Sequence, residues 1–147
     1  MDVLITDITE MSPGNYCVAG WCAASGAMVR PLPQGANWTA QLITQHGITL
    51  GATIRFNRMP QQPNSAYPHR TEDTNVSPTT TLVRPGPINW FNAGAPPLSV
   101  TLADVFEDNV ISNSTWDGYE QGVHVMQGTQ TFSLGAVAID RNNFLVT

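Results

Sequence analysis

The sequence contains no lysine, and this absence limits what the protein can bind. Six arginines face eleven aspartates and glutamates, which gives a formal net charge of −5. A protein that holds double-stranded DNA mainly through its phosphates needs a basic face, because affinity comes from the release of counterions. Six arginines can line one cleft, but they cannot coat a surface. The composition therefore argues against sequence-independent binding of long nucleic acids and is compatible with a compact anionic ligand.

Long hydrophobic runs and disulfide-type cysteine patterns are missing as well. No stretch approaches the roughly 20 apolar residues of a membrane helix, and the first residues lack the basic segment of a secretory signal. The two cysteines, Cys17 and Cys22, are an odd number of positions apart on one expected strand, so their side chains should point to opposite faces and not form a bridge. Free thiols suit a reducing compartment. We therefore expect a cytoplasmic protein that makes no membrane contact.

Residues typical of turns and strands are abundant. The chain has 12 glycines and 11 prolines in 147 residues, and threonine and valine are frequent. This composition favours short strands joined by turns over a helical bundle. The length suffices for one domain with its own core. We predict a mainly β protein that forms a single domain over residues 1–147.

An early β-hairpin is the clearest structural signal. The segment from Tyr16 to Leu32 predicts a strand, a turn at Ala23–Gly26 and a second strand. Pro31 has no N–H to give to a ladder, so we expect pairing to stop there and Arg30 to lie at the rim of a sheet. With a further strand over Val3–Ile8, the hairpin makes a three-stranded meander.

The middle of the chain predicts a short helix, a strand and a long loop. Thr39 is a suitable N-cap, and Gly47 a suitable stop, for a helix over Thr39–His46. Ile48–Met59 alternates polar and apolar residues as a half-buried strand does. Pro60–Thr81 is polar and interrupted by prolines; a loop of this length is uncommon unless it is functional or disordered, and we favour function. Beyond it we expect a helix at Thr101–Asp108 and strands at Gly122–Met126, Thr131–Ile139 and Phe144–Val146.

This loop holds the densest cluster of ionisable residues in the chain. His69, Glu72 and Asp73 are residue types that coordinate metals or act as general bases, and His124 is the residue best suited to complete such a set. The alternative is a loop held by internal interactions, in which Glu72 or Asp73 pairs with Arg70 or caps a turn. Ligand binding is the third interpretation. We assign no metal ligand, no cofactor and no catalytic residue, and whether the protein is an enzyme stays open.

Two arginines precede prolines, and several aromatic residues are candidates for stacking. Arg30 and Arg84 each belong to a Val-Arg-Pro triplet, which fits two strands ending at the same rim. Their guanidinium forks suit a phosphate or carboxylate; the alternative is a structural pair with a carboxylate. Trp21, Tyr67, Trp90 and Phe91 are of the type that stacks on a base or sugar, although an aromatic residue in a small β domain more often belongs to the core.

Several short segments together resemble one family. They are Val3–Asp7 with Met11, Cys17–Gly20, Gly26 with Val29–Leu32, Pro68–Asp73 and Ser133–Gly135. On these residues the chain resembles the uncharacterised prokaryotic proteins described as containing a dual OB domain. The resemblance implies an OB-like small barrel of five strands with one or two short helices and long proline-rich loops. It also implies a second barrel that follows or interleaves with the first, so that the chain would be a fragment. By fold analogy alone it suggests nucleic-acid or nucleotide-related work, and it supplies no catalytic residues.

We therefore predict a binding module for a nucleotide or a nucleic-acid end, with its pocket between the Arg30 strand end and the 68–73 loop. The residues expected to bind the ligand are Arg30, Tyr67, His69, Arg70, Glu72, Asp73, Arg84 and Trp90. The arginines would meet phosphate, Tyr67 or Trp90 would stack on a base, and the carboxylates would orient the arginines. The alternatives are a metal-dependent hydrolase built on the same histidine and carboxylates, and an accessory subunit of a nucleic-acid modification or defence complex. The expected partner is accordingly a nucleotide, a single-stranded nucleic acid or a larger protein.

Overall fold

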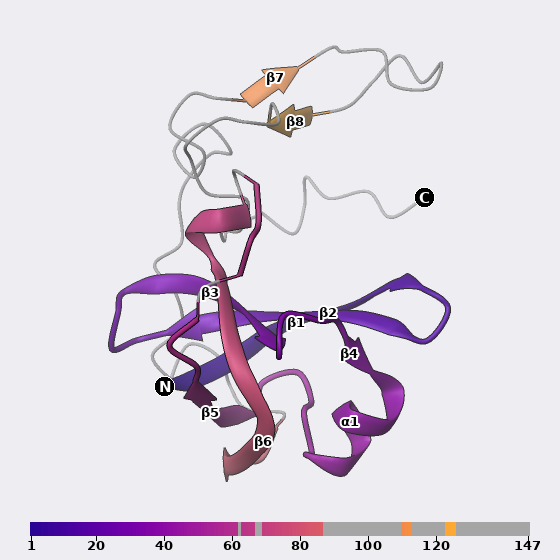
Figure 1. The fold of residues 1–147 in the computed structure, drawn as a ribbon, viewed down its shortest axis with the longest axis vertical. Helices are drawn as coiled ribbons and strands as arrows, with labels where there is room; N and C mark the ends of the chain where they lie inside the picture. The colour runs from indigo at the N-terminus through magenta and orange to yellow at the C-terminus, as the bar shows by residue number, and fades with distance from the viewer. Residues whose placement is uncertain (62, 67–68, 87–109, 113–122, 126–147) are drawn as a thin grey trace, which may run out of the picture. The chain divides into compact units, whose positions relative to one another are not determined.

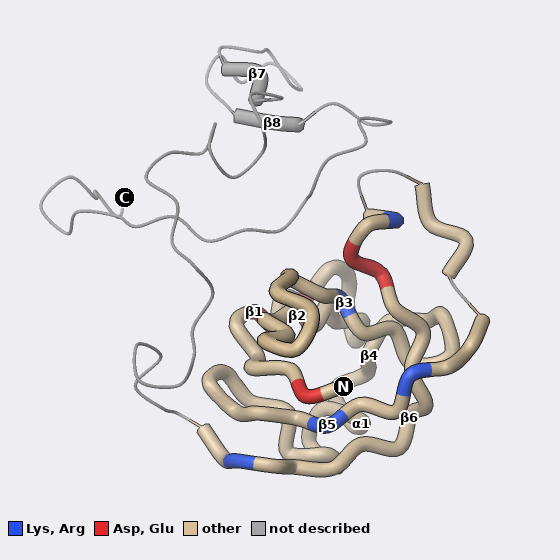
Figure 2. Tube along the Cα trace, turned by 90° about the vertical axis from the view of Figure 1, so that its left-hand side faces the viewer, with Lys and Arg blue, Asp and Glu red and all other residues tan. Residues whose placement is uncertain are grey.

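Five strands close into a barrel in the computed structural model of this protein (Figure 1 and Figure 2). The structure describes residues 1–61, 63–66, 69–86, 110–112 and 123–125. The barrel strands are β1 (Asp2–Ser12), β2 (Asn15–Cys22), β3 (Ala27–Pro33), β5 (Thr53–Arg58) and β6 (Asp73–Arg84). They follow one another around the ring in the order β1-β5-β6-β3-β2, and β2 pairs with β1 to close it. Neighbouring strands are antiparallel except β3 and β6, which are parallel.

The strand order confirms the predicted fold class. The first barrel strand pairs with the second and with the fourth in chain order, which gives a five-stranded ring like that of an OB-fold. One short helix, α1 (Ala40–Gln45), and one 3-10 turn, η1 (His69–Thr71), accompany the strands. The described residues therefore form a mainly β, OB-like small barrel.

β1 extends beyond the predicted strand Val3–Ile8, and a tight turn joins it to β2. Ser12 pairs with Asn15, so only two residues form the turn, and Gly14 has a φ of +79°, which glycine adopts without strain. Along β1, Val3 and Ile5 are fully buried, and the residue between them faces outward. The three-stranded meander of β1, β2 and β3 is as predicted.

β3 continues through two prolines, so the prediction that pairing stops at Pro31 is wrong. The N–H of Arg30 donates to the carbonyl of Glu72 at 2.9 Å, and the N–H of Gln34 donates to the carbonyl of Val76 at 2.9 Å. These donors face β6, and the prolines fall at the alternate positions, whose N–H groups would point away from β6. β2 no longer pairs with β3 at this point. Arg30 therefore lies within a strand and not at its rim.

β4 (Trp38–Thr39) pairs with the start of β2 after β3 has diverged from it. The indole N–H of Trp38 donates to the carbonyl oxygen of Pro31 at 2.7 Å, which satisfies a buried backbone acceptor. α1 follows, and the Thr39 hydroxyl caps it by accepting from the N–H of Leu42 at 3.2 Å. Gly47, with a φ of +61°, follows the end of the helix. The predicted helix, its cap and its stop are confirmed.

β6 occupies much of the segment predicted to be a loop. The loop prediction for Pro60–Thr81 is wrong from Asp73 onward, because β6 pairs first with β3 and then with β5. Threonine and valine give the segment strand propensity. Pro78 falls where the register of β5 and β6 shifts, a place where a sheet tolerates a missing N–H. On β5, buried Phe56 alternates with exposed Arg55, as predicted.

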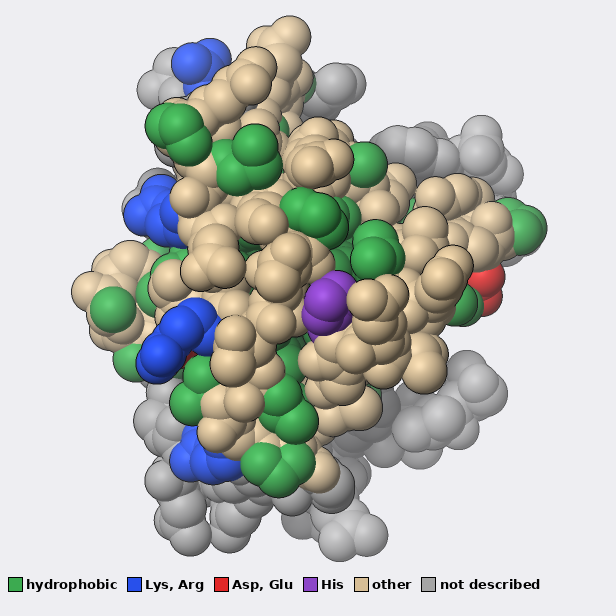
Figure 3. Space-filling view, turned by 60° about the horizontal axis from the view of Figure 1, so that its bottom comes forward, with side chains coloured by type: hydrophobic (Ala, Val, Ile, Leu, Met, Phe, Trp, Pro, Cys, Tyr) green, Lys and Arg blue, Asp and Glu red, His purple; other side chains and the backbone are tan. Residues whose placement is uncertain are grey.

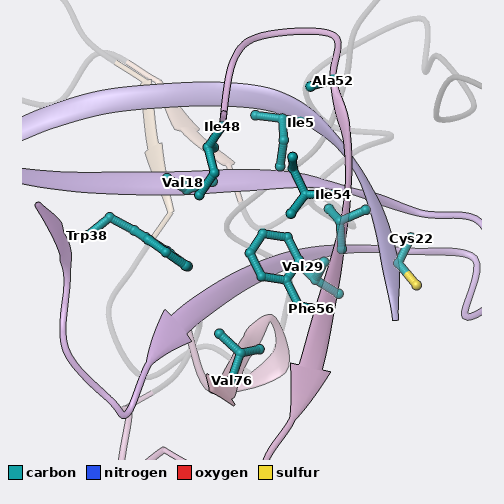
Figure 4. Close-up of a cluster of buried hydrophobic side chains, with 11 residues drawn as sticks. Ile5, Val18, Cys22, Val29, Trp38, Ile48, Ala52, Ile54, Phe56 and Val76 are labelled. Atoms are coloured by element: carbon teal, nitrogen blue, oxygen red, sulfur yellow. The ribbon is translucent and has the colours of Figure 1, made fainter. Parts of the chain in front are cut away.

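The barrel encloses a contiguous apolar core (Figure 4). Its members are Val3, Ile5, Val18, Cys22, Val29, Trp38, Ile48, Ala52, Ile54, Phe56 and Val76. The rings of Trp38 and Phe56 meet edge to face with centroids 5.8 Å apart. Cys22 lies in this core and Cys17 outside it, and both are free thiols, as the spacing predicted.

The chain divides into two units, Met1–Ser65 with Glu72–Pro96, and Ala66–Thr71 with Pro97–Thr147. In the second unit the structure describes η1 and two antiparallel strands, β7 (Val110–Ser112) and β8 (Val123–Val125). β8 falls within a predicted strand, whereas β7 has no predicted counterpart. The predicted helix Thr101–Asp108 and the strands Thr131–Ile139 and Phe144–Val146 lie outside the described residues. No helix among the described residues is long and apolar enough to cross a membrane.

Gly20 lets β2 approach β1 closely, so we expect Gly20→Ala to destabilise the barrel. A Cβ at this position would lie 2.2 Å from the carbonyl oxygen of Leu4 and 2.7 Å from Val3 Cγ1, so the strands would have to separate. We expect the free energy of unfolding, measured by urea denaturation, to fall by about 3 kcal/mol. The control is Gly14→Ala, whose Cβ meets nothing within 4 Å and adds only positive-φ strain, about 1 kcal/mol. Equal losses for the two variants would contradict the steric argument.

Candidate functional site

A row of polar side chains crosses the outer face of the barrel. Val18 and Val29 belong to the core, so their strand neighbours Cys17 and Arg30 point outward. Arg30 lies opposite Asp73 in the parallel register of β3 and β6. We call the set Asp7, Cys17, Arg30 and Asp73, one residue from each of four strands, the polar strip. Its members are close enough that the charges of the other three act on the Cys17 thiol. Figure 2 marks the charged residues along the chain.

The centre of the polar strip is the ion pair of Arg30 and Asp73. The Arg30 Nε lies 2.5 Å from Asp73 Oδ1, and the two side chains are 14% and 3% exposed. The Ser65 hydroxyl donates to the other carboxylate oxygen of Asp73. Burial opposes the charge on Arg30, but the hydrogen bond and the charge of Asp73 outweigh it, so the pKa of Arg30 is raised. The structure thus joins Arg30 to Glu72 through the backbone and to Asp73 through the side chain.

Asp73 bonds to only one nitrogen of the Arg30 guanidinium. The Arg30 Nε donates to Asp73 Oδ1, and the guanidinium lies close enough to the Cys17 thiol to lower its pKa. A guanidinium held at Nε keeps a fixed plane. The polar strip therefore presents an oriented guanidinium.

Cys17 lies beside Arg30 but is not activated as a nucleophile. Burial raises the pKa of its thiol. Arg30 lowers this pKa, while Asp7 and Asp73 raise it, and the net shift is upward. The thiol therefore stays protonated at pH 7, whereas a reactive cysteine needs its thiolate form.

The acidic residues of the predicted site are buried. Glu72 is 1% exposed and Asp73 is 6% exposed. Among the described residues, no three His, Cys, Asp or Glu side chains are grouped so as to hold a metal ion. The predicted hydrolase arrangement of His69 with the two carboxylates therefore gains no support from this part of the chain.

The remaining predicted residues of the 67–70 segment and Trp90 cannot be assigned to the polar strip. His69 and Arg70 are exposed and begin η1, which belongs to the second unit. Tyr67 and Trp90 lie outside the described residues. Their predicted roles in ligand binding stay predictions.

Arg84 does not share a rim with Arg30. Arg30 lies opposite Asp73, the first residue of β6, whereas Arg84 is the last residue of β6 and lies opposite Thr53. The prediction that both Val-Arg-Pro triplets end at one rim is therefore wrong. The pairing and direction of the strands decide where each triplet lies. The repeated Val-Arg-Pro sequence does not specify either of these.

Arg84 lines a separate groove on the outside of the barrel. The groove has a volume of about 340 Å³ and is lined by Asp2, Leu4, Trp21, Ala23, Thr53, Val83 and Arg84. Basic side chains lie along one side of the face drawn in Figure 3. Sequence reasoning missed Asp2 and Thr53, because only the cross-strand register brings them near Arg84. Trp21 was recognisable as an aromatic residue suited to stacking.

Breaking the Arg30–Asp73 pair from either side should destabilise the barrel. Asp73→Asn leaves a mostly buried guanidinium without its counter-charge, which we expect to lower the free energy of unfolding by about 3 kcal/mol. Arg30→Met should also destabilise, and the double variant should cost about 2 kcal/mol less than the sum of the single variants. Asp2→Asn is the matched control, because the pair of Asp2 with Arg55 is 42% and 56% exposed and should matter far less. Strict additivity in denaturation experiments would show that the pair contributes no coupling.

Asp7→Asn should lower the pKa of Cys17, because the negative charge of Asp7 raises it. The measurement is the rate of alkylation by iodoacetamide as a function of pH, in a Cys22→Ala background. The midpoint of the profile should move to lower pH, since the thiolate forms more readily without the carboxylate. Glu10→Gln removes a carboxylate that does not act on this thiol and serves as the control. An unchanged midpoint in Asp7→Asn would exclude the described proximity.

Comparisons with known proteins do not identify a family or a function for this chain. No family model, no curated protein and no solved structure matches this chain. The resemblance to dual OB domain proteins therefore stays a prediction that rests on its own residues.

Proposed function

We propose that the barrel is a binding module for a nucleotide or for the end of a single-stranded nucleic acid, and that Arg30 meets the phosphate. OB-folds bind oligonucleotides on the face of their second and third strands and on the loop between the fourth and fifth. In this barrel the corresponding elements are β2, β3 and the 59–72 connection. The polar strip has Cys17 on β2 and Arg30 on β3, and Ser65 of the connection donates to its Asp73. A fold does not fix a ligand, so the proposal depends on the residues of the strip.

The single observation that supports it best is the orientation of Arg30 by Asp73. The carboxylate holds Nε at 2.5 Å, and Ser65 in turn holds the carboxylate. A pre-oriented guanidinium loses little conformational freedom when it binds, which favours a bidentate contact with phosphate. Lysine has no such planar fork, and the chain uses arginine throughout.

The charge of the barrel limits the ligand to one with few phosphates. The first unit contains four arginines, and its five acidic residues bring its formal charge to 4 − 5 = −1. The second unit has two arginines and six acidic residues, hence 2 − 6 = −4. A long polyanion would meet net repulsion, whereas one terminal phosphate needs a single guanidinium. A nucleotide or a nucleic-acid end fits this balance.

Membership of the dual OB domain proteins and a cytoplasmic location belong to the same proposal. The two free thiols agree with a reducing compartment. The hydrolase and the accessory-subunit alternatives have no separate support among the described residues and stay predictions.

The test measures the affinity of the full chain for a 5′-phosphorylated thymidine tetranucleotide by titration calorimetry. Removing the 5′-phosphate should weaken binding about ten-fold or more, because a hydrogen bond to a charged group is lost. Arg30→Gln should weaken binding of the phosphorylated form by a similar factor. Arg30→Lys keeps a positive charge next to Asp73 and should fold normally, yet it should also bind more weakly because the fork is lost.

Arg58→Gln is the matched control for this test. Arg58 is exposed at the end of β5, so its replacement makes the same change in net charge away from the polar strip. If Arg30→Gln and Arg58→Gln lose the same affinity for the phosphorylated tetranucleotide, the loss reflects the change in net charge and not a specific contact of Arg30. Equal affinity for the phosphorylated and unphosphorylated tetranucleotides would refute a phosphate-binding role for Arg30.

A further inference from the structure

The groove at Arg84 is distinct from the polar strip in position and in chemistry. Arg84 and Asp73 occupy the two ends of β6, so the groove and the polar strip lie at different places on the barrel wall. The groove is built by the start of β1, the end of β2, the start of β5 and the end of β6. Every described residue that lines it belongs to the first unit.

The apolar part of the groove contains an aromatic ring. Val3 and Ile5 point into the core, so Leu4 points outward. Leu4 lies between Trp21 on one side and Thr53 on the other in the strand register. Leu4 is nevertheless only 5% exposed, and Trp21 is half-buried. These side chains offer a flat, largely dehydrated surface to a ring of the ligand.

The cationic part of the groove is a guanidinium without a carboxylate partner inside the groove. Arg84 Nη2 donates to the Thr53 hydroxyl at 3.3 Å. Its Nε is buried, and no described residue offers this nitrogen an acceptor. Among the described residues that line the groove, the only carboxylate is that of Asp2, and both its oxygens are bonded to Arg55 at 2.7 Å. The charge of Arg84 is therefore not compensated by a carboxylate bonded to it from this described lining.

We infer that this groove is a second ligand site, and that it takes a small planar aromatic ring that has one anionic group. The ring would lie against Trp21 and Leu4, and the anion would accept hydrogen bonds from the Arg84 guanidinium. A volume of about 340 Å³ is at the lower end for small-molecule sites, so one or two fused rings fit and a polymer does not. A carboxylate and a phosphate are both acceptable anions, because a guanidinium fork binds either.

The experiment follows the indole N–H signal of Trp21 in two-dimensional NMR spectra of the full chain. Trp21→Phe identifies this signal by its disappearance. The probes are 2-naphthoate and 2-naphthamide, which share the ring system and differ in charge, and adenosine 5′-monophosphate against adenosine. We expect saturable shifts with both anionic probes and at least ten-fold weaker binding of both neutral ones. A response to only one of the anionic probes would identify the source of the anion.

Two substitutions with opposite expected signs test the role of charge. Arg84→Gln should weaken binding of 2-naphthoate about ten-fold or more. Asp2→Asn removes the carboxylate from the groove and releases Arg55, so it should strengthen binding by about two- to five-fold. Thr53→Val is a milder variant that removes the hydroxyl support of Arg84 and should weaken binding if Arg84→Gln proves unstable.

Probe binding in the groove can be distinguished experimentally from the proposed nucleotide binding at the polar strip. Arg30→Lys, which keeps the positive charge next to Asp73, should leave the Trp21 shift and the affinity for 2-naphthoate unchanged, since Arg30 does not line the groove. The inference is overturned if Trp21 does not respond to millimolar anionic probes. It is also overturned if charged and neutral probes bind equally, or if folded Arg84→Gln binds as well as the parent protein.

Discussion

The parallel pairing of β3 with β6 joins the meander of β1, β2 and β3 to the pair of β5 and β6, and the rest of the structure depends on it. It joins residues 30–33 to residues 73–76, so a long loop must be closed before the contacts form. Two of the four β3 residues in this pairing are prolines and donate no hydrogen bond. The Arg30–Asp73 ion pair adds a directional contact at the first pair of the register. A shift of one residue would turn Arg30 toward the core, so its charge also specifies the register.

Features that depend on neighbouring residues could be predicted from the sequence. The hairpin turn at Ala23–Gly26, the helix cap at Thr39 and its stop at Gly47 are determined within a few positions. The alternation of Phe56 with Arg55 reflects the same local geometry. The closed barrel itself was predicted only through family resemblance, because no local pattern specifies which strand completes a ring.

Features that depend on a partner strand could not be predicted. Pro31 does not stop β3, because its missing N–H would point away from β6. Pro78 does not prevent β6, because it falls at a shift in register. The sequence does not show which strands pair, and for this reason Arg84 was predicted to lie near Arg30. Arg30 lies opposite the first residue of β6, whereas Arg84 is the last residue of that strand. The expected proximity of Arg30 to the 68–73 segment is met by its ion pair with Asp73, the first residue of β6.

Three arginines of the barrel differ in the group that each of them contacts, and this difference determines how well each could bind an anion. Arg30 faces Asp73 in a pair with 14% and 3% exposure, so it gains orientation at the expense of free charge. Arg55 faces Asp2 in a pair with 56% and 42% exposure, which water and salt screen. Among the described residues, the Arg84 side chain donates to the Thr53 hydroxyl alone and keeps its charge. The polar strip therefore suits an anion that must be held in one orientation. The groove suits an anion that is bound mainly by electrostatic attraction, because the uncharged Thr53 hydroxyl does not cancel the positive charge of Arg84.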